Sequence, residues 1–569
     1  MRSTTILSSL ALLFANAAWS FENGYHSSEY GHSGVRNPLP QAVSSEWSGW
    51  GGNIYNNRWA STNSVVNAAN SGSLTETCRL PYHLGVSAAP TVSGSMVYYP
   101  TWDGQLVALN YETCEVQWNI SVVNIIAQFA LVTDVQRTVL QVASRSSPQV
   151  DGNVLYFTTI VHALLVAVDR DTGALLSTIQ INPHPLAQLT MSPTVYNGRI
   201  FIGASSFEEV AIDIVPNYPC CSFIGNIAAV DFDQKSGKFN VAWNVSMLPP
   251  GQGWSGGAVW GSQPSIDIAR SQVFFGTGNL YTLPPASEAC QNQTANITVI
   301  AEGLVPSSCI PNDVYQEAVL AFDIQTGLVN WVRQLTPLDA WQLACGTIGG
   351  AVPRNSTLCP FTPGPDADFG MAPTFVPGST STPYGKDTLV IGQKNGELHA
   401  LSAQAGTPFW STVTSPDGSG GGLIWGVAVD ESRVYFTAAN TGLQTWQLQP
   451  SNQTISNSGF GAASLVDGSL LWEIASPMDS NSVVPPSVVN DVVFFGRTGE
   501  NITGAYEHTQ GGLIAVNKAS GVIIKDYGLD ANFHGGIAIQ NQYVMFGSGY
   551  AGGAINNWNG TGSFHVWSL

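Results

Sequence analysis

The chain has 569 residues, of which 44% are hydrophobic and only 10% are charged, and its formal net charge is −19. This acidic balance repels a phosphate backbone and argues against a nucleic-acid partner. Fifty-nine Gly and 17 Trp supply turn residues and large apolar side chains, as a core built from many short strands requires. We therefore expect a large, stably folded protein made of sheets.

The first residues have the pattern of a secretory signal peptide. Arg2 precedes an apolar run over residues 6–14, and small residues at Ala15, Ala17 and Ala18 follow that run. We expect residues 1–20 to be the signal peptide, 21–45 an N-terminal extension and 46–569 a single repeat domain. No later segment is long and apolar enough to span a bilayer, so the mature protein is expected to be secreted and extracellular.

Eight Asn-x-Ser/Thr sequons agree with export and predict a glycoprotein. They begin at Asn119, Asn244, Asn292, Asn296, Asn355, Asn452, Asn501 and Asn559.

From about residue 80 onward one pattern recurs: an apolar strand, a turn containing Gly, and a second apolar strand that usually ends at a Trp. Its copies occupy residues 106–118, 166–179, 227–243, 319–331, 398–410, 462–472 and 513–525. Because the runs beside the turns are apolar, β-branched and aromatic, they indicate hairpins rather than helices. A spacing of roughly 55–90 residues fits four-stranded sheets with loop insertions.

We predict an all-β fold, an eight-bladed β-propeller of four-stranded antiparallel sheets, with seven blades as the alternative. The eighth blade would be closed by the two ends of the chain, residues 48–59 and 564–569. Such closure would hide the unpaired edges of the first and last strands.

The eight cysteines are an even number, which an oxidising compartment favours. Their spacing suggests that Cys78 pairs with Cys114, Cys290 with Cys309, and Cys345 with Cys359. The adjacent Cys220 and Cys221 either have partners elsewhere or, if the other six pair in this way, form a vicinal disulfide. A Cys-x-x-Cys-His motif is absent from the sequence, so no covalent c-type haem is expected.

The propeller repeats, with Trp ending the blades after a Thr-Gly turn, resemble those of the quinoprotein alcohol dehydrogenases, which bind pyrroloquinoline quinone. The resemblance extends from about residue 46 to the C-terminus. Within that family, the chain is similar in particular to the polyvinyl alcohol dehydrogenase branch. The most specific parts of the resemblance are residues 205–209, 218–223, 260–262, 276–279 and 336–341.

The resemblance implies pyrroloquinoline quinone and Ca²⁺ as cofactors. It places Glu209 and Asn279 as metal ligands, with Glu208 as the alternative to Glu209, because a hard cation takes oxygen ligands. It assigns cofactor binding to Thr190, Ser206, Trp260, Lys394, Cys220 and Cys221. In these roles Trp260 would be the floor of the cofactor site, Lys394 the cation over the reactive carbonyl, and the two cysteines its roof. The structural alternatives are a loop Glu, a turn Asn, a Trp packed between blades and a solvated Lys.

The chain departs from the family pattern at two positions. Gln342 stands where a carboxylate is expected to take the alcohol proton, and an amide does not accept a proton at neutral pH. Ala258 stands where a hydrogen-bond donor is expected. Asp339 and Asp368 are the nearest alternative carboxylates and become the candidate catalytic residues, although both also suit ordinary turns.

The functional expectation is a secreted oxidoreductase that oxidises an alcohol, polyol or sugar and passes the electrons to an external acceptor such as a cytochrome. The alternative is a cofactor-free extracellular propeller that binds glycan or protein, since one fold hosts many functions. A third interpretation, a membrane-tethered assembly factor built on the same repeats, would need a lipid-anchor Cys near the cleavage site, and none is present there.

Overall fold

The computed structural model describes residues 46–294, 309–346, 354–355, 357–360, 363–499, 510–551 and 561–569. All of them belong to the compact unit Val43–Leu569. The predicted signal peptide and N-terminal extension lie outside the described residues, as do the sequons at Asn296, Asn501 and Asn559.

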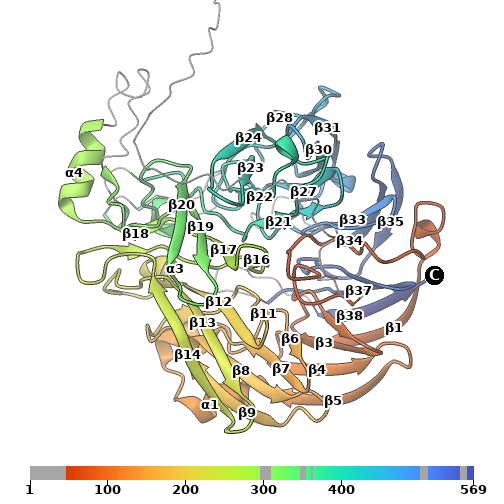
Figure 1. Cartoon of the computed structure of the whole chain (residues 1–569), viewed down its shortest axis with the longest axis horizontal. Helices are drawn as coiled ribbons and strands as arrows, with labels where there is room; N and C mark the ends of the chain where they lie inside the picture. Colours follow the sequence, from red (N-terminus) through yellow and green to blue (C-terminus); the bar gives the residue numbers. More distant parts are fainter. Residues whose placement is uncertain are drawn as a thin grey trace, which may run out of the picture. The chain divides into compact units, whose positions relative to one another are not determined.

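Eight four-stranded antiparallel sheets follow one another around a central axis, which confirms the all-β prediction and eight blades rather than seven (Figure 1). Blade 1 consists of β2 (Thr91–Ser93), β3 (Met96–Pro100), β4 (Gln105–Asn110) and β5 (Glu115–Ser121), and blade 2 of β6 (Gln149–Asp151), β7 (Val154–Thr158), β8 (Leu164–Asp169) and β9 (Leu175–Gln180). Blade 3 consists of β11 (Thr194–Tyr196), β12 (Arg199–Ser206), β13 (Asn226–Asp233) and β14 (Lys238–Ser246), and blade 4 of β16 (Ser265–Asp267), β17 (Gln272–Gly276), β19 (Ala318–Asp323) and β20 (Val329–Gln334). Blade 5 consists of β21 (Thr374–Val376), β22 (Thr388–Gly392), β23 (Glu397–Ser402) and β24 (Pro408–Val413). Blade 6 consists of β26 (Ala428–Val429), β27 (Arg433–Asn440), β30 (Gly459–Ser464) and β31 (Leu470–Ala475). Blade 7 consists of β32 (Ser487–Val489), β33 (Val492–Arg497), β34 (Gly512–Asn517) and β35 (Ile523–Gly528).

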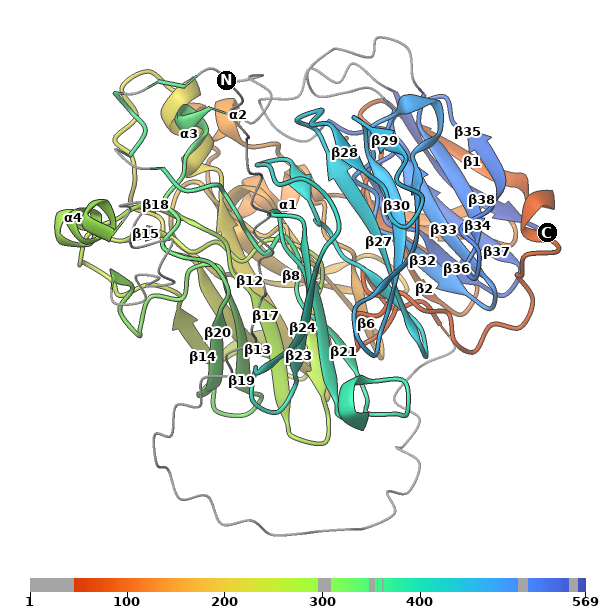
Figure 2. The ribbon, with the colours of Figure 1, turned by 90° about the horizontal axis from the view of Figure 1, so that it is seen from above.

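Short elements lie outside the four-stranded blades. The helices are α1 (Val122–Phe129), α2 (Asp134–Val139), α3 (Glu208–Ile214) and α4 (Pro285–Thr294), and the extra strands are β10 (Ala187–Gln188), β15 (Ser255–Gly256), β18 (Leu280–Thr282), β25 (Gly421–Gly422), β28 (Trp446–Gln447) and β29 (Thr454–Ile455). Helices α2 and α3 are close together at one side of the ring (Figure 2). Single turns of 3₁₀ helix occur at Ser71–Ser73, Val161–Ala163, Leu343–Cys345, Pro383–Gly385 and Pro477–Asp479.

The eighth blade joins the two ends of the chain, but only one of its predicted strands is correct. It consists of β36 (Ala538–Gln540), β37 (Tyr543–Gly547), β38 (Gly562–Ser568) and β1 (Thr75–Tyr82), and β1 pairs with β38 over its whole length. The C-terminal strand is as predicted, whereas residues 48–59 do not supply the other one. Their Gly and Asn residues form turns, such as the bond from the Tyr55 N–H to Asn53 Oδ1 at 2.9 Å, and turns of this kind interrupt a strand ladder.

Residues 47–60, which we call the inner belt, instead contact the innermost strands of successive blades. Carbonyl groups of the belt accept hydrogen bonds from backbone N–H groups of blades 1, 4, 5, 6 and 7, at Val92, Ile266, Phe375, Val429 and Val488. The belt therefore ties distant blades to one short segment.

The repeated Trp and Gly explain how neighbouring blades lock together. The indole N–H of Trp331 in blade 4 donates to the Ala403 carbonyl of blade 5 at 3.2 Å. The ring covers Gly406 in the turn of that next blade, where a Cβ would lie 2.4 Å from the indole. The same pairing recurs between Trp118 and Gly173, Trp243 and Gly327, Trp410 and Gly468, and Trp472 and Gly521.

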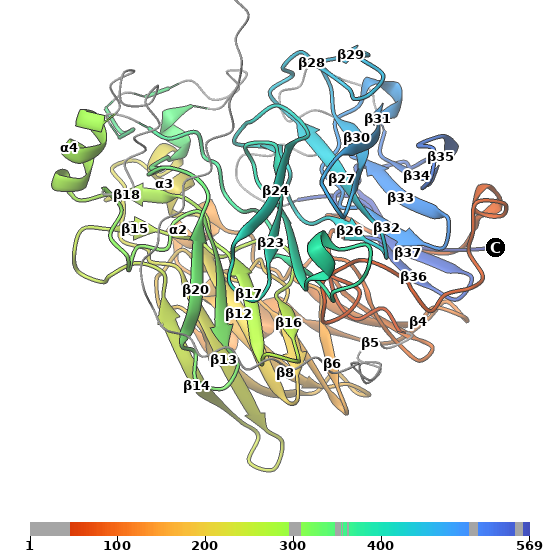
Figure 3. The same ribbon diagram turned by 45° about the horizontal axis from the view of Figure 1, so that its top comes forward.

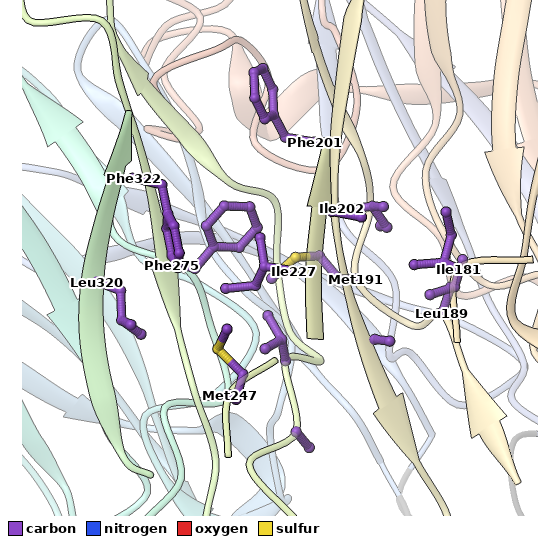
Figure 4. Close-up of a cluster of buried hydrophobic side chains, with 14 of the residues drawn as sticks. Ile181, Leu189, Met191, Phe201, Ile202, Ile227, Met247, Phe275, Leu320 and Phe322 are labelled. Carbon is purple, nitrogen blue, oxygen red and sulfur yellow. The ribbon is translucent and has the colours of Figure 1, made fainter. Parts of the chain in front are cut away.

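Apolar side chains from adjacent blades fill the space between the sheets (Figure 4). In the cluster that joins blades 2, 3 and 4, Phe201, Ile227 and Phe275 are fully buried. This packing gives the rigid frame on which the connecting loops are held.

The three disulfides predicted from spacing are present, Cys78–Cys114, Cys290–Cys309 and Cys345–Cys359. Cys220 and Cys221 form the vicinal disulfide, one of the two alternatives left open for them. Cys78 lies on β1 of blade 8 and Cys114 in the β4–β5 turn of blade 1. Their bond therefore joins the last blade to the first.

Candidate functional site

A cavity of about 210 Å³ is lined by loop residues and by Glu209 of α3. Helices α2 and α3 lie close together in the ribbon view (Figure 3). Seven of the residues predicted from the sequence line it: Thr190, Ser206, Glu209, Trp260, Asn279, Asp368 and Lys394. They come from connections in blades 2 to 5. Side chains as far apart in the chain as Thr190 and Lys394 therefore share one cavity.

Lys394, in the turn between β22 and β23, is the centre of the charged part of the cavity. Its Nζ donates to Asp366 Oδ1 and to Asp368 Oδ2, both at 2.9 Å, and lies 5.4 Å from the centre of the Trp260 ring. The surrounding carboxylates raise the pKa of Lys394 against the opposing effect of burial, so the side chain stays cationic.

Asp368 is fixed by three donors. Besides Lys394, the Trp260 indole N–H donates to its Oδ2 at 3.0 Å, and the Asn279 backbone N–H donates to its Oδ1 at 2.6 Å. Gly278 leaves room for this carboxylate, because a Cβ there would lie 2.5 Å from Asp368 Oδ1. The carboxylate is thus held in one orientation at the cavity wall.

Glu209 lies in the first turn of α3 and faces the cavity. Its carboxylate accepts no hydrogen bond from the described residues. Burial, followed by the charge of Asp368, raises its pKa to about 8, although the charge of Lys394 acts in the opposite direction. A carboxylate in this state would gain from a cation placed in the cavity.

Asn279 follows β17 and is almost fully buried. Its amide Nδ2 donates to the carbonyl oxygens of Leu280 and Trp341 at 3.1 and 3.0 Å. Both N–H groups are therefore engaged, while Oδ1 accepts no hydrogen bond from the described part of the chain. The side chain presents an oxygen to a cavity that Glu209 also faces.

Hydroxyl groups form another wall. Thr190 Oγ1 donates to the Trp260 carbonyl at 2.8 Å and lies 3.1 Å from Ser205 Oγ. Ser206 Oγ accepts the Glu208 N–H at 2.8 Å, at the start of α3. The hydroxyls thus position Trp260 and the helix of Glu209 as well as lining the cavity.

Asp339, the other candidate catalytic carboxylate, is not among the residues that line the cavity. It is almost fully buried and accepts the Ala367 N–H at 2.8 Å. Burial raises its pKa, and the neighbouring Glu317, also buried, has a pKa well above its ordinary value for the same reason. Asp339 therefore supports the loop of Asp366 and Asp368 through its hydrogen bond to Ala367.

Gln342 also lies outside the cavity lining. It is buried, and its Nε2 donates to the Tyr281 carbonyl at 2.7 Å. Ala258 does line the cavity. The position expected to carry a base is thus occupied by an amide in a structural hydrogen bond.

The vicinal disulfide is on the loop after α3 and does not line the cavity either. Glu208 anchors this loop, since its carboxylate accepts the Phe223 N–H at 2.7 Å and the Ser222 N–H at 2.9 Å. Glu208 therefore has a structural place, separate from that of Glu209. The role of Cys220 and Cys221 over a cofactor stays a prediction.

Several other lining residues were not candidates from the sequence, among them Arg145, Trp425 and Tyr550. The Arg145 guanidinium lies 4.2 Å from the centre of the Trp425 ring, and that ring packs edge-to-face on Trp260 at 4.9 Å. Arg145 gives no motif because it lies in an irregular loop. Trp425, like Trp260, does not end a blade repeat, so the repeat pattern gave no signal for it.

Trp425 is held from behind by the inner belt. Its carbonyl accepts hydrogen bonds from the Trp50 indole N–H at 2.7 Å and from Arg58 Nη2 at 3.2 Å. Its φ of 70° is in the left-handed region, which is unusual for a bulky residue. Two donors on one carbonyl stabilise this conformation.

Across the described residues, no helix has the length and apolar character of a membrane span. The same residues contain no cluster of three or more His, Cys, Asp or Glu side chains arranged to hold a metal ion.

Comparison with known proteins places the repeats in a family. A family model described as outer membrane protein assembly factor BamB matches residues 61–218 and 317–562. The chain is 25% identical over 471 residues to a polyvinylalcohol dehydrogenase of Sphingopyxis sp. (strain 113P3), which covers 79% of this chain and 62% of that protein. It is 29% identical over 412 residues to a polyvinylalcohol dehydrogenase of Pseudomonas sp, covering 70% and 56%. The aligned part thus spans less than two thirds of either relative.

Solved structures agree on the fold. The quinohemoprotein alcohol dehydrogenase of Comamonas testosteroni superposes with a TM-score of 0.64 at 16% identity, covering 93% of this chain and 81% of that one. A europium-containing methanol dehydrogenase superposes with a TM-score of 0.62 at 15% identity, covering 92% and 98%. At these identities the likeness concerns the propeller alone.

Proposed function

Because the chain belongs to the family described as outer membrane protein assembly factor BamB, whose fold alone fixes no reaction, we propose its function from the cavity. We propose a secreted oxidoreductase that oxidises an alcohol, polyol or sugar with pyrroloquinoline quinone and Ca²⁺ and passes the electrons to an external acceptor. The observation that carries this proposal is the convergence of seven predicted residues on one cavity. The names of the two polyvinylalcohol dehydrogenase relatives support an alcohol as substrate.

The donor set fits such a pair of cofactors. The Glu209 carboxylate and Asn279 Oδ1 both face the cavity without a hydrogen bond from the described residues, and oxygen is the ligand that Ca²⁺ prefers. Since Ca²⁺ takes about six to eight oxygens, these two residues would hold it only together with oxygens of the quinone. Trp260 offers an indole ring, and Thr190 and Ser206 offer hydroxyls, to a flat polar molecule.

When bound, the quinone supplies an electrophilic carbonyl that accepts hydride from an alcohol, and the metal polarises that carbonyl. The chain provides the surroundings. Lys394 places a positive charge where negative charge develops. Asp368 is the carboxylate in position to receive the alcohol proton, and we propose it as the base in preference to Asp339, which does not line the cavity.

The test is a calorimetric titration of demetallated protein with pyrroloquinoline quinone, with and without Ca²⁺. We expect binding that requires the metal and that weakens at least about 10-fold in Glu209→Ala and Asn279→Ala, since changing even a group that supports a metal ligand costs about 10–100-fold in affinity. Glu112→Ala, in an exposed turn of blade 1, is the matched control and should bind like the parent.

One observation favours a different function. Gln342 stands where the base is expected and its amide is engaged with Tyr281, so the site lacks one part of the family pattern. A propeller that binds glycan or protein without a cofactor would show no quinone binding with or without Ca²⁺, and that result would replace the oxidoreductase proposal.

A further inference from the structure

A second cavity, of about 450 Å³, lies between blades 2 and 3 and shares no lining residue with the first. The loop after β9, the loop that follows the vicinal disulfide and the outer strands β13 and β14 form its walls. Its polar lining consists of Asn182, His184, Ser222, Asn226, Asn244 and Ser246. Nothing in the proposed oxidoreductase uses this cavity.

Three amides form a chain that leads outward across it. Asn182 Nδ2 donates to Asn226 Oδ1 at 2.8 Å, and Asn226 Nδ2 donates to Asn244 Oδ1 at 2.8 Å. Asn182 and Asn226 are buried, whereas Asn244 is exposed. Because Oδ1 of Asn244 is the acceptor, its Nδ2 is the outer end of the chain, and it donates to no described residue.

Asn244 is also the first residue of the sequon Asn244-Val245-Ser246, and Asn244 and Ser246 are two residues apart on β14. Side chains two apart on a strand share a face, and both line the cavity. We propose that Asn244 carries an N-linked oligosaccharide whose first sugars lie in this cavity rather than in solvent.

The modification is a group transfer from a lipid-linked oligosaccharide pyrophosphate in the secretory pathway. A bond forms between C1 of the first N-acetylglucosamine and Nδ2 of Asn244, and the bond from C1 to the pyrophosphate oxygen breaks. Nδ2 loses one proton, and the lipid pyrophosphate is the leaving group. Oδ1 is unchanged, so it keeps the hydrogen bond from Asn226.

The cavity has the chemistry that sugars require. Ser246 presents a hydroxyl. Ser222 Oγ lies 3.2 Å from His184 Nε2 and donates to Glu208 Oε1 at 3.4 Å, so its oxygen can also accept a hydrogen bond from a sugar hydroxyl or acetamido group. Pro183 and Pro250, both exposed, add apolar surface at the rim. The volume lies within the range of about 300–1,000 Å³ typical of small-molecule sites, enough for the first sugars of a glycan.

Blade 1 contains a matched site without this cavity. Asn119 follows Trp118 on β5 as Asn244 follows Trp243 on β14, and each Trp pairs with an Ala of the preceding strand. Asn119 is exposed, but its Nδ2 donates to Gln105 Oε1 at 3.3 Å, and it lines neither cavity described above. A glycan on Asn119 would therefore extend into solvent.

The experiment uses the full chain secreted from a eukaryotic host. Glycopeptide mass spectrometry measures occupancy, and release by an N-glycosidase is timed on folded and on denatured protein. We expect Asn244 to be occupied, and its release from folded protein to be at least about ten-fold slower than release at Asn119, because the enzyme must wait for local opening. After denaturation the two rates should be equal.

Two variants separate modification from folding. Ser246→Ala removes the sequon and keeps the Asn244 amide, so the mass should fall by one glycan, whereas Ser246→Thr should restore it. An unoccupied Asn244 in secreted protein, or equal release rates at Asn244 and Asn119 in the folded state, would overturn the proposal.

Discussion

The charged residues of the cavity determine one another's state. Lys394 is buried between Asp366 and Asp368, and burying a charge is unfavourable unless an opposite charge and hydrogen bonds accompany it. Asp366 shows that burial disfavours its charged form. Burial raises the pKa of this carboxyl well above the ordinary value, even though the charge of Lys394 lowers it. Replacing one member of this group would therefore leave the others buried without compensation.

A buried carboxyl outside the cavity provides a measurable pH dependence. Glu473 on β31 is 5% exposed, and burial raises its pKa to about 7, against the opposing effect of the Gln449 N–H, which donates to its Oε2 at 2.6 Å. The folded protein thus binds a proton more tightly than the unfolded chain does. Stability from this group is present below pH 4.5 and is lost as the pH rises through 7.

We predict that Glu473→Gln removes this loss of stability at high pH. Above pH 7 its free energy of unfolding should exceed that of the parent by up to about 3 kcal/mol, from about 1.4 kcal/mol per pKa unit, whereas near pH 4.5 the two should be similar. Urea denaturation at pH 4.5, 6 and 8 measures the difference. A difference between the two proteins that does not change with pH would contradict the assignment.

At the scale of elements, the pairing of each blade-ending Trp with a Gly of the next blade sets the spacing between sheets. The Gly is required for two separate reasons: a positive φ and the indole ring above it. Gly406 has a φ of 65° and its Cβ position lies 2.4 Å from Trp331. Gly94 in blade 1 has a φ of 60° but nothing within 4 Å of its Cβ position. The two positions separate backbone strain from contact with the Trp.

We predict that Gly406→Ala destabilises the protein by about 2–4 kcal/mol, from backbone strain plus overpacking. Gly94→Ala, which adds the strain alone, should cost about 1 kcal/mol. Chemical denaturation of both variants gives the comparison, and near-ultraviolet circular dichroism reports the Trp environment. Equal losses in the two variants would mean that the Trp moves aside and does not set the blade spacing.

At the scale of the whole molecule, the repeats made the fold predictable, whereas the site forms only when the blades close into a ring. Trp331 and Gly406 indicate a blade in the sequence, because most copies of the repeat have a Trp at the end of a strand and a Gly in the turn. Glu209 and Asn279 were found through their resemblance to a family, since the cavity that unites them arises only when the ring closes. Arg145 was missed for the same reason. Residues 48–59 were assigned to a strand because strands from the two ends of the chain would close the eighth blade, while their Gly and Asn residues favour turns.

Ring closure itself can be tested through the disulfide between Cys78 and Cys114, which connects blade 8 to blade 1. The bond closes a loop over a sequence separation of 36 residues, and constraining the unfolded chain in this way stabilises a protein by about 3–4 kcal/mol. The double variant Cys78→Ser with Cys114→Ser should therefore unfold at lower denaturant concentration than the parent. Release of this bond also frees β1, which pairs with β38 to complete the last sheet.

The matched control is Cys345→Ser with Cys359→Ser, which opens a bond of sequence separation 14 within one insertion. Chain entropy alone predicts nearly the same loss for both, about 3 kcal/mol for the shorter loop. If the first bond also holds the ring closed, hydrogen exchange should rise in β1 and β38 when it is removed and stay low there in the control. Unchanged protection of both strands in the first variant would show that hydrogen bonding between β1 and β38 closes the propeller without the disulfide.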